Sequence, residues 1–236
     1  MILAAGRGER MRPLSDACPK PLLEAGGKPL IVWQIEALAR AGFRRIVINA
    51  AHLAGDLVAR LGDGRALGVS IAWSVEPEAL ETAGGIATAL PLLPPGPALV
   101  VSADIHSSFD YASLLPRAAR MARDGAAPRV HLVMVPNPAY HPAGDFALVP
   151  GPDGATDRIA PDGDARLTYA NIGLYDTALF RELPRWTRLK LLPLLRDWIG
   201  RGLVSGERYD GAWANVGTPG DLASLDASLR QRAALT

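Results

Sequence analysis

The chain has 236 residues, of which 49% are hydrophobic, and its 25 Lys and Arg residues nearly balance its 24 Asp and Glu residues. This is the composition of a globular protein, and the near-zero net charge excludes a generally basic nucleic-acid-binding surface and an acidic disordered segment. The single cysteine, Cys18, excludes a disulfide framework and suits a reducing compartment, so we expect a cytoplasmic protein. No signal-peptide pattern or run of roughly 20 apolar residues is present, so we expect no membrane partner.

The first half of the chain alternates short apolar runs with segments of helical periodicity. Such alternation predicts a Rossmann-like α/β fold, a mostly parallel sheet with helices on both faces. Gly42 is expected to end the first helix. The expected strands are Met1–Ala4, Arg45–Asn49, Val69–Trp73 and Ala98–Ser102, and the expected helices are Leu30–Ala41, Ala54–Leu61 and Gly85–Leu92.

The order of elements changes after Asp124, where apolar segments are joined by Gly, Pro and Asp turns. This change predicts a small antiparallel insertion beside the sheet. No linker or repeat is visible, so we expect one domain over 1–236, with halves at 1–124 and 125–236. The expected strands are Val130–Pro136, Asp145–Val149, Arg158–Ile159 and Leu167–Tyr175. The expected helices are Leu191–Gly200 and Pro219–Ala233. Two short extended segments are expected between these helices, Val204–Tyr209 and Ala212–Val216.

The loop after the first strand has the composition of a phosphate-binding site. Gly6 and Gly8 allow backbone N–H groups to approach an anion, and Arg10 and Lys20 add positive charge. A dinucleotide fingerprint is excluded because Met11 stands where its third small residue belongs, and a P-loop is excluded because Gly-Lys-Ser/Thr is absent. The pattern favours a polyphosphate, since arginine grips terminal phosphate oxygens and lysine supplies a compact charge.

Three candidate ligand-binding segments follow expected strands. They are Gly6–Lys20, Glu76–Gly85 and Asp104. Ligands of open parallel sheets gather beyond the carboxyl ends of the strands. We therefore expect these segments to face one crevice.

Several motifs together carry a resemblance to a known family. Leu3 to Leu14 reads Leu-Ala-Ala-Gly-x-Gly-x-Arg-Met-x-Pro-Leu and is followed by Pro-Lys-Pro-Leu, which resembles the sugar-1-phosphate nucleotidyltransferases, enzymes that make nucleoside-diphosphate sugars. The resemblance implies the GT-A-like fold of nucleotide-diphospho-sugar transferases. Four further matches extend it over nearly the whole chain: Glu76-Pro77 with Leu80–Gly85, Ser102-Ala103-Asp104, Asn171–Tyr175 and Trp213–Pro219.

Within this family the chain is most similar to the uridylyltransferases that act on N-acetylmuramic acid α-1-phosphate in peptidoglycan recycling. Leu80-Glu81-Thr82, Gly144-Asp145-Phe146 and Lys190-Leu191 carry this likeness. It implies transfer of a uridylyl group from UTP to the sugar 1-phosphate, giving UDP-N-acetylmuramic acid and pyrophosphate. We expect no C-terminal β-helix of the kind that several relatives carry, and we expect a monomer or a homodimer.

The resemblance also implies residue roles. Lys20 neutralises the α-phosphate and Arg10 the departing pyrophosphate, while Asp104 and Asn215 bind Mg²⁺. Many family members carry aspartate where Asn215 stands, so Asn215 is a natural weak ligand, an impairing residue or an engineered substitution. The implied nucleotide-binding residues are Leu3, Ala4, Ala5, Gly6, Gly8, Glu76, Thr82 and Gly84, and the implied sugar-binding residues are Gly144, Asp145, Asn171 and Lys190.

Two other functions stay open. One is a mannose- or glucose-1-phosphate nucleotidyltransferase that uses GTP, dTTP or UTP, because base and sugar choice rests on a few contacts. The other is a non-catalytic nucleotide-sugar-binding regulatory module, which Asn215 favours and the presence of Lys20 and Asp104 opposes. A muramic acid substrate also brings a lactyl carboxylate that requires a cation, for which Lys190 and Lys28 are both candidates.

Overall fold

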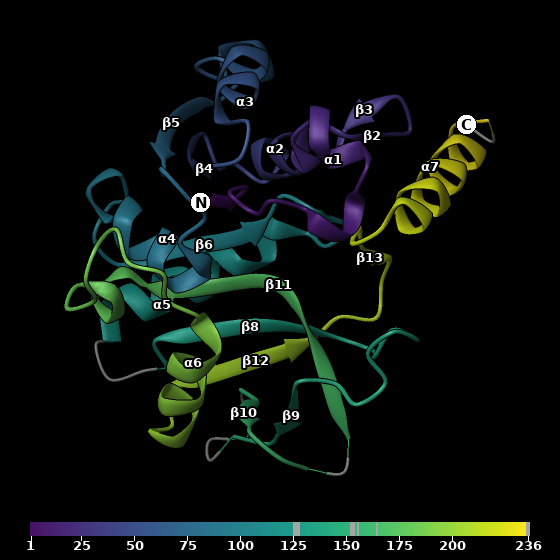
Figure 1. Ribbon diagram of the computed structural model, residues 1–236. Helices are drawn as coiled ribbons and strands as arrows, with labels where there is room; N and C mark the ends of the chain where they lie inside the picture. Colours follow the sequence, from purple (N-terminus) through teal and green to yellow (C-terminus); the bar gives the residue numbers. More distant parts are fainter. Residues whose placement is uncertain (125–127, 152–153, 155, 164, 235–236) are drawn as a thin grey trace.

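The computed structural model in Figure 1 describes residues 1–236 except 125–127, 152–153, 155, 164 and 235–236. Within the described residues the chain forms a mixed sheet of nine strands in the order β5-β4-β1-β6-β11-β8-β12-β10-β9. The strands are β1 (Ile2–Leu3), β4 (Arg45–Ala50), β5 (Ser70–Val75), β6 (Pro97–Ser102), β8 (Val130–Val135), β9 (Phe146–Val149), β10 (Arg158–Ala160), β11 (Arg166–Asp176) and β12 (Val204–Arg208).

The predicted parallel sheet is confirmed in the first half, where β1 pairs in parallel with β4 and β6, and β4 with β5. The second half differs from the prediction of an insertion beside the sheet, because its strands continue the same sheet. The long strand β11 pairs antiparallel with β6 on one side and with β8 on the other. The predicted boundary between 124 and 125 borders residues 125–127, which lie outside the described residues.

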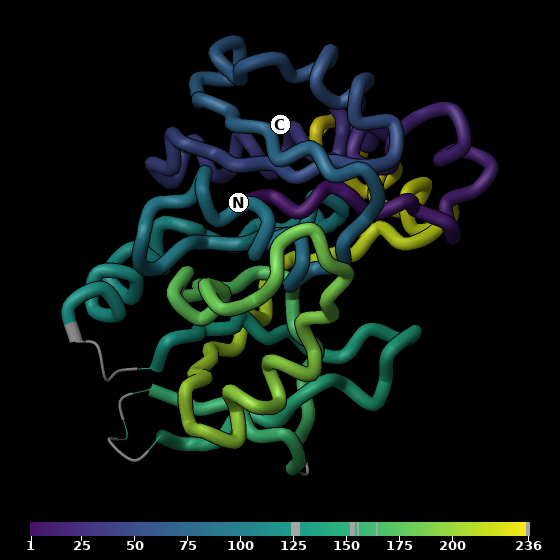
Figure 2. The backbone as a smooth tube through the Cα atoms, turned by 60° about the vertical axis from the view of Figure 1, so that its left-hand side comes forward, coloured from purple at the N-terminus to yellow at the C-terminus, as the bar shows by residue number. Residues whose placement is uncertain are grey.

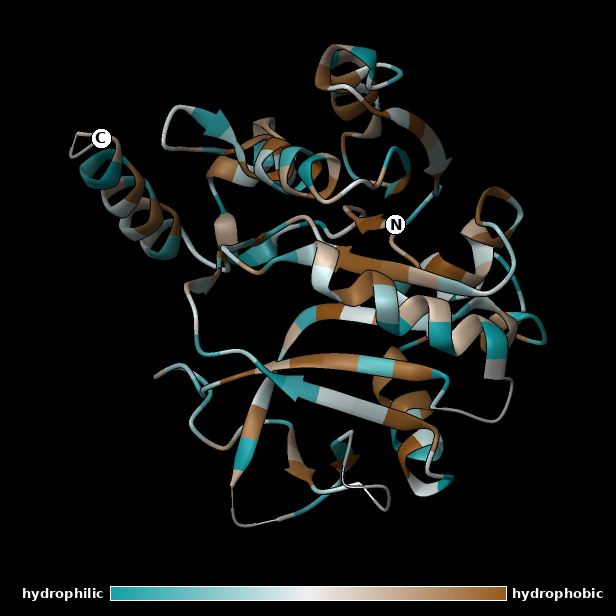
Figure 3. Cartoon of the chain, turned by 180° about the vertical axis from the view of Figure 1, so that it is seen from behind, coloured by the Kyte–Doolittle hydropathy of each residue, from teal (hydrophilic) through white to brown (hydrophobic). Residues whose placement is uncertain are grey.

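Helices cover both faces of the sheet and enclose two separate cores. Leu99 and Val101 of β6 face the core beneath α2 (Leu30–Arg40) and α3 (Ala54–Leu61), whereas Val100 faces the core beneath α4 (Glu81–Ala89) and α6 (Leu191–Gly200). This alternation is expected of strands buried on both faces. Figure 3 shows the resulting apolar colouring of the central strands.

The helix boundaries follow local signals except at α4. As predicted, α2 ends before Gly42, which adopts φ +93°, and the Phe43 N–H closes the turn on the Leu38 carbonyl at 2.9 Å. The expected helix Gly85–Leu92 is wrong at its start, because α4 already begins at Glu81 and gives way to a 3-10 turn at Leu90. The other 3-10 turns are Glu9–Met11, Lys20–Leu22, Arg65–Leu67, Tyr111–Leu114 and Thr177–Phe180.

The C-terminal helix brings the end of the chain to the N-terminal loop. Helix α7 (Pro219–Ala233) begins with a capping box between Thr218 and Asp221, and Asp226 accepts a 2.7 Å hydrogen bond from the Gly26 N–H. Figure 2 shows this yellow helix beside the purple N-terminal segment. Within the described residues no helix is long and apolar enough to cross a membrane. The remaining elements are α1 (Leu14–Ala17), α5 (Leu115–Asp124), β2 (Glu24–Ala25), β3 (Lys28–Pro29), β7 (Ile105–Ser107) and β13 (Trp213–Asn215).

Candidate active site

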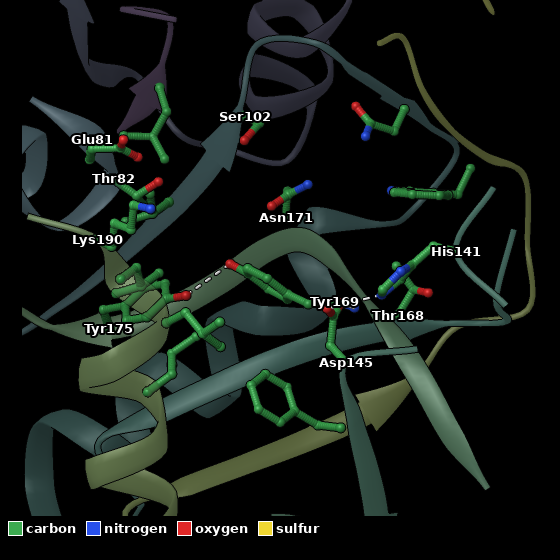
Figure 4. A pocket seen from close by; sticks show the side chains of 18 of the residues that line it. Glu81, Thr82, Ser102, His141, Asp145, Thr168, Tyr169, Asn171, Tyr175 and Lys190 are labelled. Atoms are coloured by element: carbon green, nitrogen blue, oxygen red, sulfur yellow. Dashed lines mark hydrogen bonds and ion pairs between the residues drawn. The ribbon is translucent and has the colours of Figure 1, made fainter. Parts of the chain in front are cut away.

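Two adjoining hollows lie at the carboxyl ends of β1 and β6. The loop pocket, of about 650 Å³, is lined by the loop after β1 together with Lys20, Asp104 and Arg188. The strand pocket, of about 430 Å³, is lined mainly by β11, the 140–146 segment and the start of α6 (Figure 4). The two hollows are neighbours, because Leu3, Glu81, Thr82 and Ser102 line both.

The loop after β1 presents backbone donors to the loop pocket. Its carbonyl at Gly8 already accepts hydrogen bonds from the Met11 N–H at 2.8 Å and from the Ser15 hydroxyl at 2.7 Å. The N–H groups of residues 5–8 donate to no other residue that the structure describes. Gly8 adopts φ +65°, and a Cβ there would lie 3.1 Å from the Lys20 Cβ. The glycine therefore allows both the turn and the close packing of Lys20, leaving free N–H groups for an anion.

Lys20 and Asp104 meet in the loop pocket. The Lys20 Nζ lies 2.5 Å from Asp104 Oδ2, and Lys20 as a whole is only 9% exposed. Lys20 begins the 3-10 turn after Pro19, and Asp104 is the second residue after the end of β6. The structure thus brings the two predicted catalytic and metal-binding residues together, although their roles stay predictions.

Asn215 is placed beside Asp104 by the pairing of β13 with β7. Asn215 lies opposite Ile105, and the next N–H, that of Val216, donates to the Asp104 carbonyl at 2.8 Å. The Asn215 side chain lines the strand pocket together with Tyr140, whose pKa is raised by burial. Asp104 and Asn215 therefore flank the junction of the two pockets.

The donor set at this junction fits a magnesium ion. Among the described residues, no group of three or more His, Cys, Asp or Glu side chains is arranged so that it could hold a metal ion. Mg²⁺ favours hard oxygen ligands, uses few protein side chains and takes the remainder from phosphates and water. A carboxylate at Asp104 and an amide oxygen at Asn215 meet that requirement, with one protein charge instead of two.

Arg10 stands over Gly217 at the rim of the loop pocket. A Cβ at Gly217 would lie 3.3 Å from the Arg10 guanidinium, so the glycine leaves room for this side chain. Arg12 instead pairs with Asp16 at 3.1 Å and lines neither pocket. Of these two arginines, only Arg10 is placed to meet a ligand.

Asn171 enters the strand pocket from an irregularity in β11. The pairing of β11 with β8 shifts register between Tyr169 and Gly173, and Asn171 inside this bulge adopts φ +57°. A bulge turns a side chain out of the regular alternation of a strand, and asparagine tolerates the left-handed conformation better than most residues. Figure 4 shows the amide directed into the cavity.

The floor of the strand pocket carries an acid and two buried phenols. Asp145 accepts a 2.8 Å hydrogen bond from the Tyr169 N–H and pairs with His141 Nε2 at 3.1 Å. The Tyr169 and Tyr175 hydroxyls are 2.9 Å apart, and burial raises the pKa of both, so both stay neutral donors and acceptors. The predicted residue Gly144 lines neither pocket, and a Cβ there would lie 2.7 Å from Asn137 Oδ1.

Lys190 reaches the strand pocket at the first turn of α6, for which it is the N-cap residue. It has no ion-pair partner among the described residues, and Figure 4 shows it beside Glu81 and Thr82. Lys28 instead contacts Glu36 at 2.6 Å, lies over the Trp33 ring and lines neither pocket. Of the two lysines considered for a substrate carboxylate, only Lys190 is in place.

The segment before Lys190 is fixed to the start of α4 through its backbone. The Leu189 carbonyl accepts hydrogen bonds from the Ala83 and Gly84 N–H groups at 3.0 and 3.1 Å, and the Leu189 N–H donates to the Leu80 carbonyl at 3.0 Å. A Cβ on Gly84 would overlap the Thr187 carbonyl oxygen. Gly84 therefore lies outside both pockets, and these helix N–H groups are used inside the protein instead of by a ligand.

Glu76, predicted to meet the nucleotide, lies behind the loop pocket. It is 2% exposed and accepts hydrogen bonds from the Asn49 amide at 2.7 Å and from the Leu80 N–H at 3.1 Å. Asn49 in turn accepts from the Ala4 N–H at 2.9 Å and itself lines the pocket. Burial raises the pKa of Glu76. Glu76 thus supports Asn49, which sequence reasoning missed.

Glu81 and Arg188 are further pocket residues to which the sequence assigned no role. Glu81 adopts φ +61°, a conformation that costs an L-residue about 1–2 kcal/mol. Its Oε1 lies 3.7 Å from the Arg188 Nη2, with the two side chains 39% and 62% exposed. A pair so exposed contributes about 0–1 kcal/mol. Arg188 belongs to no motif, so only the folded chain reveals it.

Comparison with known proteins settles the family. The family model described as nucleotidyl transferase matches residues 1–232. The chain belongs to this family. It is 46% identical over 219 residues to the N-acetylmuramate alpha-1-phosphate uridylyltransferase of Neisseria meningitidis, with 92% of each chain covered. It is 32% identical over 238 residues to the enzyme of the same name from Caulobacter vibrioides, with 98% of this chain and 96% of the relative covered.

More distant members of the nucleotidyl transferase family match as well. A mannose-1-phosphate guanylyltransferase catalytic subunit beta of Danio rerio is 27% identical over 230 residues, with 94% of this chain and 61% of the relative covered. A solved structure assigned as a Bacillus anthracis glucose-1-phosphate thymidylyltransferase superposes with a TM-score of 0.80 at 21% identity, covering 97% of this chain and 94% of the other. This superposition shows that the two chains share a fold, and it confirms the predicted α/β fold of nucleotide-sugar transferases for this chain.

Proposed function

We propose that this nucleotidyltransferase transfers a uridylyl group from UTP to N-acetylmuramic acid α-1-phosphate, in peptidoglycan recycling. The observation that carries the proposal is the pair of adjoining pockets, with Lys20 and Asp104 in one and Lys190 in the other. The identity of 46% to a relative named for this reaction supports the same substrates. The loop pocket would hold UTP, and the strand pocket the sugar phosphate.

The reaction is an in-line displacement at phosphorus. A phosphate oxygen of the sugar 1-phosphate forms a bond to the α-phosphorus of UTP, the bond between that phosphorus and the bridging α,β-oxygen breaks, and pyrophosphate leaves. The attacking oxygen is already anionic near neutral pH, so no general base is required. Catalysis then depends on positioning and charge neutralisation, supplied by Lys20 at the α-phosphate and Arg10 at the pyrophosphate.

Asp104 and Asn215 are the residues that would hold Mg²⁺. When bound, the ion supplies further neutralisation of phosphate charge at the junction of the pockets. Lys20 contacts the same Asp104 carboxylate at 2.5 Å, so the free protein keeps this carboxylate compensated.

Lys190 supports muramic acid over other sugars. The lactyl ether of this sugar ends in a carboxylate, and Lys190, which forms no ion pair with any residue that the structure describes, is suited to meet it in the strand pocket. Leu191, Leu192 and Leu195 line the same hollow and offer apolar contacts to methyl groups. The polar residues Asp145 and Asn171 are suited to ring hydroxyls and the N-acetyl group.

The setting of the reaction is part of the proposal. UTP and sugar phosphates are cytoplasmic metabolites, and the one cysteine, Cys18, is a free thiol. We accordingly propose a cytoplasmic enzyme that acts as a monomer or homodimer.

A substrate panel tests the proposal. UTP, dTTP and GTP are each combined with the 1-phosphates of N-acetylmuramic acid, N-acetylglucosamine, glucose and mannose, and pyrophosphate release is measured. We expect the highest kcat/KM for UTP with N-acetylmuramic acid 1-phosphate. A higher value for GTP with mannose 1-phosphate would replace our assignment with a guanylyltransferase. Calorimetric binding without pyrophosphate at any Mg²⁺ concentration would replace it with a non-catalytic binding module.

A further inference from the structure

We propose that Glu81 determines substrate specificity by accepting hydrogen bonds from hydroxyl groups of a bound sugar ring, and that Arg188 positions its carboxylate. The ring is either the ribose of the nucleotide or the hexose of the sugar phosphate. This inference rests on the proposed function for the identity of the two substrates. It concerns two residues to which the sequence analysis assigned no role, since Glu81 stands in a motif without a stated function and Arg188 stands in none.

The first argument is the backbone of Glu81. Among the described residues, Leu53, Glu81, Asn171 and Trp186 are the non-glycine residues with positive φ. Glu81 and Asn171 both line the strand pocket. Asparagine enters the left-handed region with local help from its side chain, whereas glutamate has no such advantage. Strained backbone of this kind persists where the surrounding structure imposes it, commonly at functional sites.

Among the described residues, no strong side-chain contact of Glu81 offsets this strain. Within the part of the chain that the structure describes, the Glu81 carboxylate pairs only with Arg188, at 3.7 Å, and this pair is largely open to water. Glu81 does not cap its own helix, because the Ala83 and Gly84 N–H groups donate to the Leu189 carbonyl. The side chain therefore does little for stability, which leaves its place in the pockets as the reason for its presence.

The position of Glu81 points to a hydroxyl ligand. Its side chain borders both hollows, at the place where a nucleotide in one meets a sugar in the other. An ionised carboxylate only accepts hydrogen bonds and repels phosphate, so its partner must be a donor. Sugar hydroxyls are the donors that both substrates carry.

Arg188 is suited to hold this carboxylate. Its neighbour Leu189 is bound to Leu80, Ala83 and Gly84 through backbone hydrogen bonds, which fixes the segment over the first turn of α4. The guanidinium lines the loop pocket and faces the Glu81 carboxylate. It offsets a negative charge that would otherwise oppose a triphosphate in the same hollow.

The Glu81→Gly variant separates binding from stability. Glycine adopts positive φ without strain, so we expect the melting temperature to rise by roughly 2–6 °C. We also expect the KM for one substrate to rise about tenfold or more, as for loss of a hydrogen bond to a charged group. The substrate affected identifies the ring, UTP for the ribose and the sugar phosphate for the hexose. A lower melting temperature, or two KM values within about twofold of the parent, overturns the proposal.

Further variants test the role of Arg188. Arg188→Met should raise the same KM that Glu81→Gly raises. In the double variant, which carries both changes, Arg188→Met should have no further effect, because Arg188 acts through Glu81. An additive effect would overturn that positioning role. Arg185→Met is the matched control, since Arg185 stacks near Trp186 outside both pockets and its loss should leave both KM values unchanged.

The experiment remains decisive if the parent protein binds the two substrates without turning them over. Calorimetric titration of UTP and of N-acetylmuramic acid 1-phosphate into the parent and the Glu81→Gly variant then replaces the two KM values. Absence of turnover in the parent contradicts the proposed function alone. A loss of affinity in the Glu81→Gly variant still supports the contact, and equal affinities contradict it.

Discussion

Lys20 and Asp104 are 84 positions apart in the sequence, yet the lysine Nζ lies 2.5 Å from the aspartate Oδ2. The side chain of Lys20 is 11% exposed and that of Asp104 is 30% exposed. The charge of the lysine is therefore more dependent on its partner than the charge of the aspartate is, because water reaches the carboxylate. This asymmetry makes the two residues separable by experiment.

Replacing either residue should abolish most of the activity. We expect kcat of Lys20→Met and of Asp104→Ala to fall about 10²–10³-fold at saturating substrates, as for removal of one positioned charge. Asp104→Ala should also melt at a lower temperature than Lys20→Met, because it leaves a nearly buried ammonium unpaired. Pyrophosphate release and thermal denaturation measure the two effects. A near-parental rate in either variant contradicts the assignment, and the reverse order of melting temperatures contradicts the burial argument.

Two of the arginines that follow β1, Arg10 and Arg12, offer a matched comparison. Arg10 lines the loop pocket above Gly217, whereas Arg12 is 52% exposed and pairs with Asp16. Arg10→Met should lower kcat/KM for UTP by about 10²-fold or more, and Arg12→Met should leave it within about twofold. Initial rates at varied UTP concentration measure both. Equal losses in the two variants would show that the loop acts through its overall charge.

The strands of the first half could be predicted because each one is marked by an apolar run in its own segment of the sequence. In β4, the run Ile46-Val47-Ile48 is apolar without a break, as expected of a strand buried on both faces. The start of α4 was not predictable, since it depends on the left-handed Glu81 and on the docking of Leu189. Both are effects of tertiary structure that no periodicity records.

In the candidate site, too, some features could be predicted from the local sequence and others depend on the folded structure. Lys20 and Asp104 lie in motifs specific enough to be found in the sequence, and folding brings them into one pocket. Glu76 and Gly84 lie in motifs too, but a motif does not reveal that they face the interior, where one supports Asn49 and the other admits the Thr187 carbonyl. Supporting residues and contact residues look alike until the chain is folded.

Asn215 should set the demand for magnesium. Replacing its amide with a carboxylate beside Asp104 adds a charged oxygen ligand, so Asn215→Asp should lower the Mg²⁺ concentration needed for half-maximal rate. Asn215→Ala should raise it, and neither change should alter the fold, because the backbone pairing of β13 with β7 does not involve the side chain. Rates across a Mg²⁺ titration measure the effect, with circular dichroism as the control. Equal Mg²⁺ dependence in the parent and both variants would remove Asn215 from the metal site.

Lys190 should control the choice of sugar. Lys190→Met keeps a long side chain but removes the charge that we assign to the lactyl carboxylate. We expect kcat/KM to fall about tenfold or more for N-acetylmuramic acid 1-phosphate and to change little for N-acetylglucosamine 1-phosphate, which lacks that group. Lys28→Met is the control, because Lys28 pairs with Glu36 outside both pockets. Equal losses for both sugars would assign Lys190 to the shared phosphate.

His131 should make stability depend on pH. Its side chain is 1% exposed and contacts Ser205 at 2.8 Å, and burial lowers its pKa below the usual 6.5. As pH falls below 6.5 the unfolded chain binds a proton that the folded chain resists, so stability is full above 6.5 and is lost toward the lowered value. Burial of Glu76 acts in the opposite direction, because its raised pKa favours the folded state in acid.

Comparison with a variant isolates the histidine from other groups. The melting temperature of the parent minus that of His131→Gln should decrease as pH is lowered from 7.5 to about 5.5, because the glutamine cannot be protonated. The prediction is contradicted if the melting temperature of the parent minus that of His131→Gln increases as the pH is lowered. Such a result would show that the folded protein protonates His131 readily.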